Sequence, residues 1–231
     1  MGGTGPRRAW VSWSSGKDSA LALHAILTSG EVEVVGLLTT VNAAFERVAM
    51  HGVRRSLLDA QADALGLPLD VVELPWPCPN EAYETLMAAA VDRARGSGVE
   101  AVVFGDLFLD DVRRYREQML EGSGLVPVFP LWGQPTDELA GRLLAVGVRA
   151  VVTSVDLRQL PKALAGRWYD ESFLADLPAG VDPCGENGEF HTVVVASPDF
   201  ARPLDVTVGE IVERDGFAYA DVVPVVGPSP T

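Results

Sequence analysis

Six residues near the start of the chain, Ser14, Ser15, Gly16, Lys17, Asp18 and Ser19, have the types and spacing of a phosphate-binding loop. They lie between an apolar segment predicted to be a strand, 9–13, and a segment predicted to be a helix, 19–27. A short Ser/Gly turn at such a junction directs backbone N–H groups toward an anion, and the helix dipole and the Lys17 ammonium add positive charge. The pattern predicts that these six residues bind the polyphosphate of a nucleotide.

The loop resembles the PP-loop of ATP pyrophosphatases, Ser-Gly-Gly-Lys-Asp-Ser, with Ser15 in place of the first glycine. We expect the Ser15 hydroxyl to add a hydrogen-bond donor, rather than the backbone there to need a positive φ. Lys17 and Lys162 are the only lysines among 18 basic residues, so a lysine here indicates a need for a compact point charge. The alternative is an ordinary helix start with polar residues in its first turn.

Composition restricts the partners of the chain. A formal net charge of −14 over 231 residues argues against a broad nucleic-acid surface, and the arginine clusters at 54–55 and 113–116 suit a single small anion or a solvated helix face. Two cysteines, Cys78 and Cys184, are too few for a disulfide framework or a paired zinc motif. Apolar runs are too short for a membrane span and the first residues lack a signal-peptide pattern, so we expect a cytoplasmic protein without a membrane partner.

Apolar segments alternate with helical ones in the order of a doubly wound, Rossmann-like parallel sheet, which makes the fold class α/β. The predicted strands and helices after the loop are, in order, 32–40, 53–65, 69–74, 81–95, 101–104, 110–120 and 126–129. A helix at 137–146 and a strand at 150–155 precede a region of crowded turns, which predicts a smaller C-terminal α+β domain. The expected division is an ATP-binding domain at 1–130, a substrate domain at 131–225 and a loose tail at 226–231. An exposed apolar patch on the helix at 139–146 would suit a homodimer.

Ligands of such sheets bind at the carboxyl ends of the strands, where the strand order reverses. Thr39 and Thr40 are expected after the second strand, where they would hold adenine or ribose, or simply end the strand. Gly105 and Asp106 follow the fourth strand, which we expect beside the first. Asp106 is then placed to hold Mg²⁺ or a ribose hydroxyl, the alternative being a cap of the next helix.

A second dense motif runs from Asp182 to Thr192. Asn187-Gly188 suits a type I′ turn, so one interpretation is a bare hairpin tip. In a strand that starts at Gly188, however, Glu189 and His191 share one face while Phe190 points to the other. This pattern predicts a pocket formed by Glu186, Asn187, Glu189 and His191, in which His191, one of three histidines, transfers a proton or orients a polar substrate.

The two motifs, with Met50-His51-Gly52, Phe104-Gly105-Asp106 and Pro130-Leu131-Trp132, resemble the diphthine–ammonia ligase family of PP-loop ATP pyrophosphatases. The resemblance covers about 11–195 and implies a HUP-type ATP-binding domain, use of ATP and Mg²⁺, and amidation of a carboxylate by ammonia through an acyl adenylate. Catalytic roles are then expected for Lys17, Asp18, Glu189 and His191. His51 and Arg116 join Glu186, Asn187, Glu189 and His191 as expected substrate-binding residues.

The substrate and two other functions stay open. The diphthine pathway belongs to archaea and eukaryotes, whereas a composition rich in alanine and arginine is typical of a high-GC bacterium, so another carboxylate is an alternative to diphthine. An ATP- or AMP-binding regulator would keep the loop without turnover. A PP-loop tRNA-thiolation enzyme would need reactive cysteines, for which Cys78 and Cys184 are poorly placed.

Overall fold

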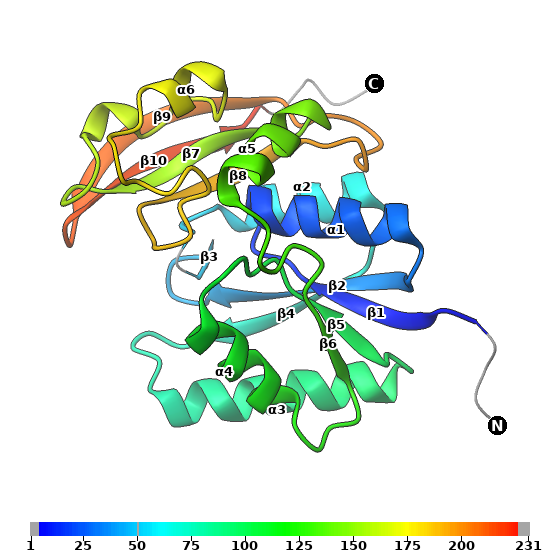
Figure 1. Cartoon of the computed structure of the whole chain (residues 1–231). Coiled ribbons are helices and arrows are strands. Elements are labelled where there is room, and N and C mark those ends of the chain that lie inside the picture. Colours follow the sequence, from blue (N-terminus) through cyan, green and yellow to red (C-terminus); the bar gives the residue numbers. More distant parts are fainter. Residues whose placement is uncertain (1–4, 50, 226–231) are drawn as a thin grey trace, which may run out of the picture.

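The structure is a computed structural model that describes residues 5–49 and 51–225. Two sheets form its framework (Figure 1). The first sheet has the order β3-β2-β1-β5-β6, with β4 paired to β2, and every pairing in it is parallel except that of β3. Its strands are β1 (Arg7–Ser12), β2 (Val32–Asn42), β3 (Arg47–Val48), β4 (Leu69–Leu74), β5 (Ala101–Val103) and β6 (Val126–Val128). The helices between them are α1 (Lys17–Ser29), α2 (Arg55–Leu65), α3 (Asn80–Gly96) and α4 (Asp110–Leu120).

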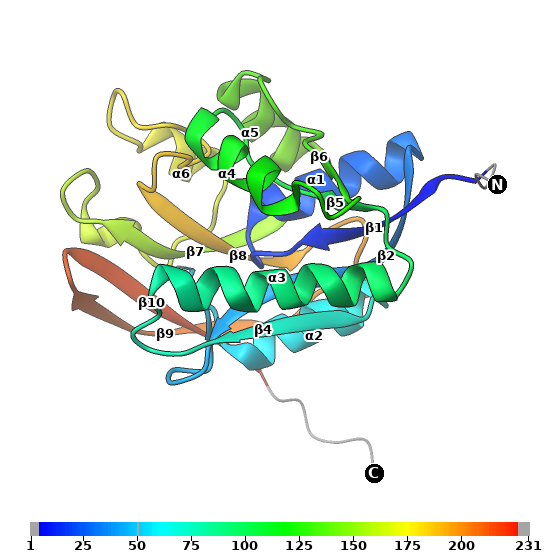
Figure 2. The ribbon, with the colours of Figure 1, turned by 90° about the horizontal axis from the view of Figure 1, so that it is seen from below.

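Alternation along β1 explains why helices cover both faces of this sheet. Ala9 and Val11 belong to the core cluster that contains residues of α1 and α2, whereas Trp10 belongs to the cluster that contains residues of α3. Successive residues of a strand point to opposite faces, so both faces are apolar and both must be covered. Figure 2 shows α3 lying across the face opposite to α1 and α2.

The strand order reverses at β1, which pairs with β2 on one side and with β5 on the other. The prediction that the fourth strand of the parallel sheet lies beside the first is therefore confirmed. Loops that follow β1 and β5 begin at neighbouring carboxyl ends, which is the place where ligands bind in sheets of this kind.

The second sheet is antiparallel, with the order β8-β7-β10-β9. Its strands are β7 (Arg149–Asp156), β8 (Phe190–Ala196), β9 (Val206–Arg214) and β10 (Phe217–Pro224). The helix α5 (Thr136–Ala145) precedes β7, and η1 (Lys162–Leu164) and α6 (Glu171–Ala175) lie between β7 and β8. Buried residues of β7 and β8 share one cluster with those of α1 and α2, so these helices are packed between the two sheets (Figure 1). The predicted fold class is confirmed, while the domain boundary at 131 stays a prediction.

Two expectations about this framework are wrong. Leu139, Ala140 and Leu143 of α5 are buried in the core shared by the two sheets, so the expected exposed patch is absent and the homodimer loses its proposed surface. The second strand does not end at Thr39 and Thr40, because β2 continues to Asn42, where it pairs with β3 and β4.

The predictions that involve Met50 and the tail at 226–231 concern residues outside those that the structure describes. Across residues 5–49 and 51–225, no helix is long and apolar enough to cross a membrane.

Candidate active site

The loop between β1 and α1 closes on itself through hydroxyl groups. The Gly16 N–H donates to Ser14 Oγ at 3.3 Å, and Ser19 Oγ donates to the Gly16 carbonyl at 2.9 Å. The Lys17 N–H donates to Thr192 Oγ1, on β8, at 3.1 Å. Two N–H groups of the predicted phosphate loop are thus bound by hydroxyl oxygens, one of them from the second sheet.

Ser15 corrects one expectation about this loop. Its φ is +68°, in the left-handed region that favours glycine, and its buried hydroxyl has no hydrogen-bond partner. The position thus requires a positive φ, and the hydroxyl contributes no bond to the fold.

Lys17 is buried, with 2% of its side chain exposed, and its ammonium contacts both parts of the molecule. Nζ lies 2.8 Å from Asp18 Oδ2, donates to the Cys184 carbonyl, and stands 5.3 Å from the centre of the Phe190 ring. Burial alone would lower the pKa of Lys17, but the negative charge of Asp18 and further nearby groups outweigh it and raise the pKa. The predicted phosphate-binding cation is therefore charged.

A cavity of about 170 Å³ brings the two sequence motifs together. The predicted site residues that line it are Ser14, Lys17, Asp18, Ser19, His51, Gly105, Asp106, Arg116, Glu186 and His191. Those that do not are Ser15, Gly16, Thr39, Asn187 and Glu189. Small-molecule sites usually have about 300–1,000 Å³, so this cavity is smaller than a site that would enclose a whole nucleotide with its acceptor.

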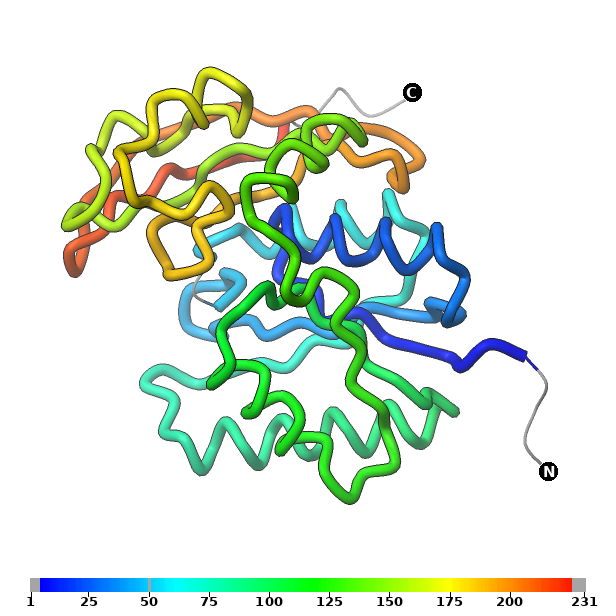
Figure 3. Tube along the Cα trace, in the orientation of Figure 1, coloured from blue at the N-terminus to red at the C-terminus, as the bar shows by residue number. Residues whose placement is uncertain are grey.

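The segment before β8 is a double turn, not a hairpin tip. The Gly185 N–H donates to the Asp182 carbonyl at 2.9 Å, and the Gly188 N–H donates to the Gly185 carbonyl at 3.1 Å. Asn187 lacks the positive φ that a type I′ turn requires, and β8 starts at Phe190 and pairs with β7. Figure 3 shows this segment descending from the second sheet toward the start of α1.

Glu189 holds the double turn together and does not face the cavity. It is 1% exposed, and its Oε1 accepts hydrogen bonds from the Asp182 N–H at 3.1 Å and from Asn187 Nδ2 at 3.0 Å. Asp182 in turn accepts the Glu186 N–H at 2.8 Å. The prediction that Glu189 and His191 face one pocket is wrong, because Glu189 precedes the strand and its side chain turns into the loop; Phe190 lines the cavity instead.

Glu186 links the double turn to the end of β5. Its Oε1 accepts the Leu107 N–H at 2.8 Å, directly after Gly105 and Asp106. Burial raises the pKa of Glu186 to about 7, supported by the charges of Asp18 and Asp106 and opposed by the Leu107 bond. A carboxyl group with this pKa exchanges a proton readily near neutral pH.

Two imidazoles meet at the rim of the phosphate loop. The ring centres of His51 and His191 are 4.5 Å apart. Burial and the charge of Lys17 lower the pKa of His191 to about 4, and burial, His191 and Lys17 hold the pKa of His51 well below its usual range. Both rings are neutral at pH 7. The turn that carries His51 is held by Arg47, whose Nη1 donates to the Gly52 carbonyl at 2.7 Å.

Asp106 and Arg116 also come together, with Nε and Oδ2 3.5 Å apart. Burial raises the pKa of Asp106, and Arg116 partly offsets this. Among the described residues, no three potential metal ligands of the His, Cys, Asp and Glu types converge. Mg²⁺ is often held by one or two carboxylates with substrate phosphates. Asp106 fits that limited role.

Gly105 allows the close approach of β5 to α1. A Cβ added there would lie 3.0 Å from the Asp18 carbonyl and from the Ser19 nitrogen.

Three other arginines of the predicted clusters form ion pairs outside the cavity: Arg54 with Asp221, Arg55 with Asp59, and Arg113 with Glu117.

Family models match both parts of the chain. The diphthamide synthase N-terminal domain matches residues 7–127, and the C-terminal domain of the same family matches residues 136–222. The chain belongs to the diphthamide synthase family. The predicted family and enzyme class are thereby confirmed, and membership of this ligase family also implies the use of ATP.

Relatives with curated names are diphthine–ammonia ligases. The protein from Homo sapiens is 24% identical over 90% of this chain and 86% of its own length, and the protein from Danio rerio is 25% identical over 90% of each. A U34-tRNA thiolase with a [4Fe-4S] cluster, from Methanococcus maripaludis, aligns over 62% of this chain and 59% of its own, with a TM-score of 0.37 and 16% identity. That alignment is too weak to bear on function.

The sequence of this diphthamide synthase family member did not indicate several residues of the site. They are the cavity-lining residues Ser12, Phe104, Cys184, Gly185, Phe190 and Thr192. Cys184 and Thr192 accept hydrogen bonds from Lys17 although they lie more than 160 positions away in the chain, so no local sequence pattern predicts these contacts. Phe104, Cys184 and Thr192 stand within motifs that carried the family resemblance, which was the available signal.

Proposed function

We propose that this chain is an ATP-dependent ligase that adenylates a carboxylate, releases pyrophosphate, and then amidates the acyl group with ammonia. One observation carries the proposal: the cation of the phosphate loop, Lys17, and the carboxyl group of the double turn, Glu186, line the same small cavity. This arrangement supports the proposal, because a cation suited to phosphate and a group able to accept a proton near pH 7 line one cavity.

The first step makes the carboxylate reactive. A carboxylate oxygen of the acceptor attacks the α-phosphorus of ATP, the bond to the β-phosphate breaks, and pyrophosphate leaves. Negative charge grows on the leaving group, where Lys17 and the N–H groups of the loop stabilise it. Asp106 would hold Mg²⁺ together with the phosphates, and the ion would supply positive charge to neutralise them.

Binding of phosphate changes the partners of Lys17. Its ammonium now contacts Asp18 and the Cys184 carbonyl, and a phosphate oxygen would replace or join these acceptors. Two loop N–H groups would likewise exchange hydroxyl oxygens for phosphate oxygens. Thr192 and Cys184 belong to the second part of the chain. Nucleotide binding would therefore directly change the hydrogen bonds of residues on the acceptor side.

The second step forms the amide. The ammonia nitrogen attacks the acyl carbon, AMP leaves with the electrons of the acyl–oxygen bond, and the nitrogen gives up a proton. We assign the acceptance of that proton to Glu186, whose pKa of about 7 suits it. His51 and His191, both neutral, orient the acceptor together with Arg116, which also lines the cavity.

The acceptor is a carboxylate; diphthine, the substrate named for the curated relatives, is one candidate. Thiolation of tRNA has little support, because burial raises the pKa of the Cys184 thiol to about 12 and the net charge is −14. We place the reaction in the cytoplasm, where ATP is available.

Product analysis tests the proposal. The protein is incubated with Mg²⁺-ATP and ¹⁵N-ammonium, with and without pools of small carboxylates and cell extract, and products are identified by mass. AMP and pyrophosphate that appear with an acceptor, together with ¹⁵N in an amide, are expected. Tight ATP binding without cleavage in every pool would favour a regulator, and ADP with phosphate would contradict the mechanism.

A further inference from the structure

Gln61, on α2, is fully buried and all of its polar groups have partners. Its Nε2 donates to the Ser15 carbonyl at 3.1 Å and to the Val194 carbonyl at 2.7 Å, while its Oε1 accepts the Trp13 indole N–H at 2.9 Å. One side chain therefore joins the residue after β1, the phosphate loop and β8. A buried amide with every hydrogen bond made fixes the relative position of the groups it binds.

Ser15 is the strained member of this group. A left-handed conformation is strained for a non-glycine residue, and the Ser15 side chain makes no hydrogen bond that would offset the strain. Its carbonyl, in contrast, accepts two bonds, from the Val194 N–H at 2.9 Å and from Gln61 Nε2. The loop conformation is thus held through the Ser15 carbonyl.

We propose that Gln61 is a positioning residue of the phosphate loop, and that it keeps Ser15 in the left-handed conformation that presents Lys17 to the cavity. The inference rests on the proposed function, because it assumes that this loop binds the nucleotide. If Ser15 rotated to an ordinary φ, its carbonyl would leave both donors, and a buried N–H of Gln61 would lose its partner.

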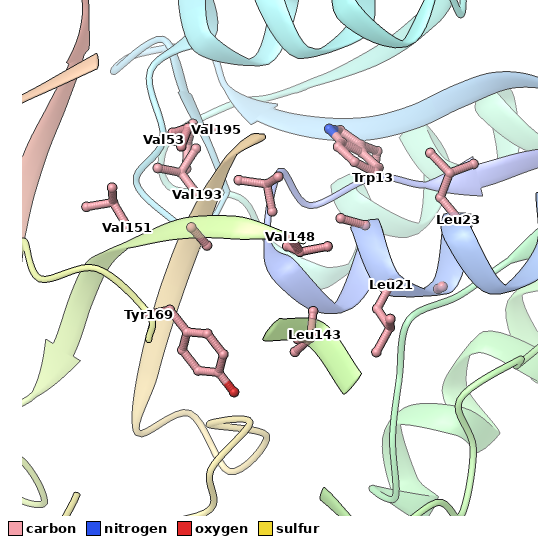
Figure 4. Close-up of a cluster of buried hydrophobic side chains, with 14 of the residues drawn as sticks. Trp13, Leu21, Leu23, Val53, Leu143, Val148, Val151, Tyr169, Val193 and Val195 are labelled. Carbon is pink, nitrogen blue, oxygen red and sulfur yellow. The ribbon is translucent and has the colours of Figure 1, made fainter. Parts of the chain in front are cut away.

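The hydrogen bond from Trp13 fixes the position of the Gln61 amide. The Trp13 side chain is 1% exposed and belongs to the buried cluster that contains residues of α1, α2 and both sheets; Figure 4 shows it among other side chains of that cluster. The indole N–H also sets the orientation of the amide, since only the oxygen of Gln61 accepts it. Nε2 is then directed at the two carbonyls.

Affinity for Mg²⁺-ATP in a double-mutant cycle tests the proposal. Gln61→Met has similar volume and lacks all three bonds; we expect its Kd to rise about tenfold, or about 1.4 kcal/mol. Adding Ser15→Gly to Gln61→Met should recover at least about half of that loss on the free-energy scale, because glycine adopts a positive φ without strain. A purely structural role for Gln61 predicts no such rescue.

Leu58→Ala is the matched control. Leu58 is a fully buried residue of the same helix that lies outside the cavity, so its truncation destabilises the core without touching the loop. At a temperature where all variants are folded, we expect Leu58→Ala to keep the wild-type Kd. An equal loss of affinity in Leu58→Ala and Gln61→Met, or no rescue by Ser15→Gly, would overturn the proposal.

A readout without nucleotide separates this inference from the proposed function. The backbone chemical shifts of Ser15 report its φ, and we expect them to leave the left-handed range in Gln61→Met while core resonances are retained. If wild-type protein bound no ATP, the proposed function would fail, and the Ser15 shifts alone would then decide on Gln61. Ser15 shifts unchanged by Gln61→Met would overturn the positioning role.

Discussion

The phosphate loop and the double turn line one cavity, but they are built in different ways. The loop 14–19 follows from local sequence: a buried strand, a short turn and a helix that starts at Lys17. The double turn 182–189 has no repeating backbone pattern and depends on the buried carboxylate of Glu189. A site can therefore combine a part fixed by secondary structure with a part fixed by side-chain bonds.

The largest effect is expected on the loop side, from Lys17→Ala. Loss of the ammonium removes the cation that stabilises the departing pyrophosphate, so kcat for AMP formation should fall at least about 100-fold. Lys17→Arg should not restore it, because a planar guanidinium does not fit the place of a compact ammonium. Rates are measured with circular dichroism as the control for folding. Turnover retained in Lys17→Ala would remove the loop from the mechanism.

Glu186→Gln tests the proton-accepting group on the other side. We expect kcat for amide formation to fall about 10- to 100-fold. In the wild type, the rate should rise with pH through about 7 as Glu186 loses its proton, and this acid limb should vanish in Glu186→Gln. A pH–rate profile checks both points; an unchanged acid limb would assign it to another group.

The same variant has a stability signature. Because the pKa of Glu186 is raised from 4.5 to about 7 in the folded chain, the folded state binds more protons between these pH values. The free energy of unfolding therefore contains a contribution that falls as the pH rises through this window. Glu186→Gln removes it, so the variant should gain on the order of 2 kcal/mol relative to wild type between pH 5 and 8, measured by urea unfolding.

Glu189→Ala sharpens the comparison, because it removes hydrogen bonds that hold the double turn in shape and leaves the cavity-lining groups in place. The Asp182 N–H would lose its buried acceptor at a cost of about 1–3 kcal/mol, which corresponds to a fall in Tm of roughly 5 °C for a chain of this size. Glu189→Gln keeps an oxygen for these bonds and should restore most of the stability and activity. Glu189→Gln as inactive as Glu189→Ala would instead make Glu189 catalytic.

The smallest effect is expected from His191→Ala. If the neutral ring only orients the acceptor, kcat/KM for the acceptor should fall about fivefold, while the Kd for ATP is retained. Steady-state kinetics with varied acceptor, and calorimetry with ATP, make the distinction. A loss of ATP affinity would move His191 to the nucleotide side of the cavity.

The sequence predicted what local physics decides. The order of strands and helices, the switch point between β1 and β5, and the start of α1 at the loop all follow from apolar patterning and turn residues. The side chain of Glu189 differs from the prediction because β8 starts at Phe190, two residues after the strand start at Gly188 that the alternating pattern indicates. The roles of Gln61, Thr192 and the Cys184 carbonyl depend on contacts between segments far apart in the chain, which no local pattern encodes.

The most direct measurement is exchange of labelled pyrophosphate into ATP, with the acceptor-containing pool but no ammonium, for the wild type, Lys17→Ala and Glu186→Gln. This exchange reports adenylation alone. We predict exchange in the wild type and in Glu186→Gln, which then fails to form the amide, and none in Lys17→Ala. Exchange that survives in Lys17→Ala and is lost in Glu186→Gln would contradict the division of work between the loop and the double turn.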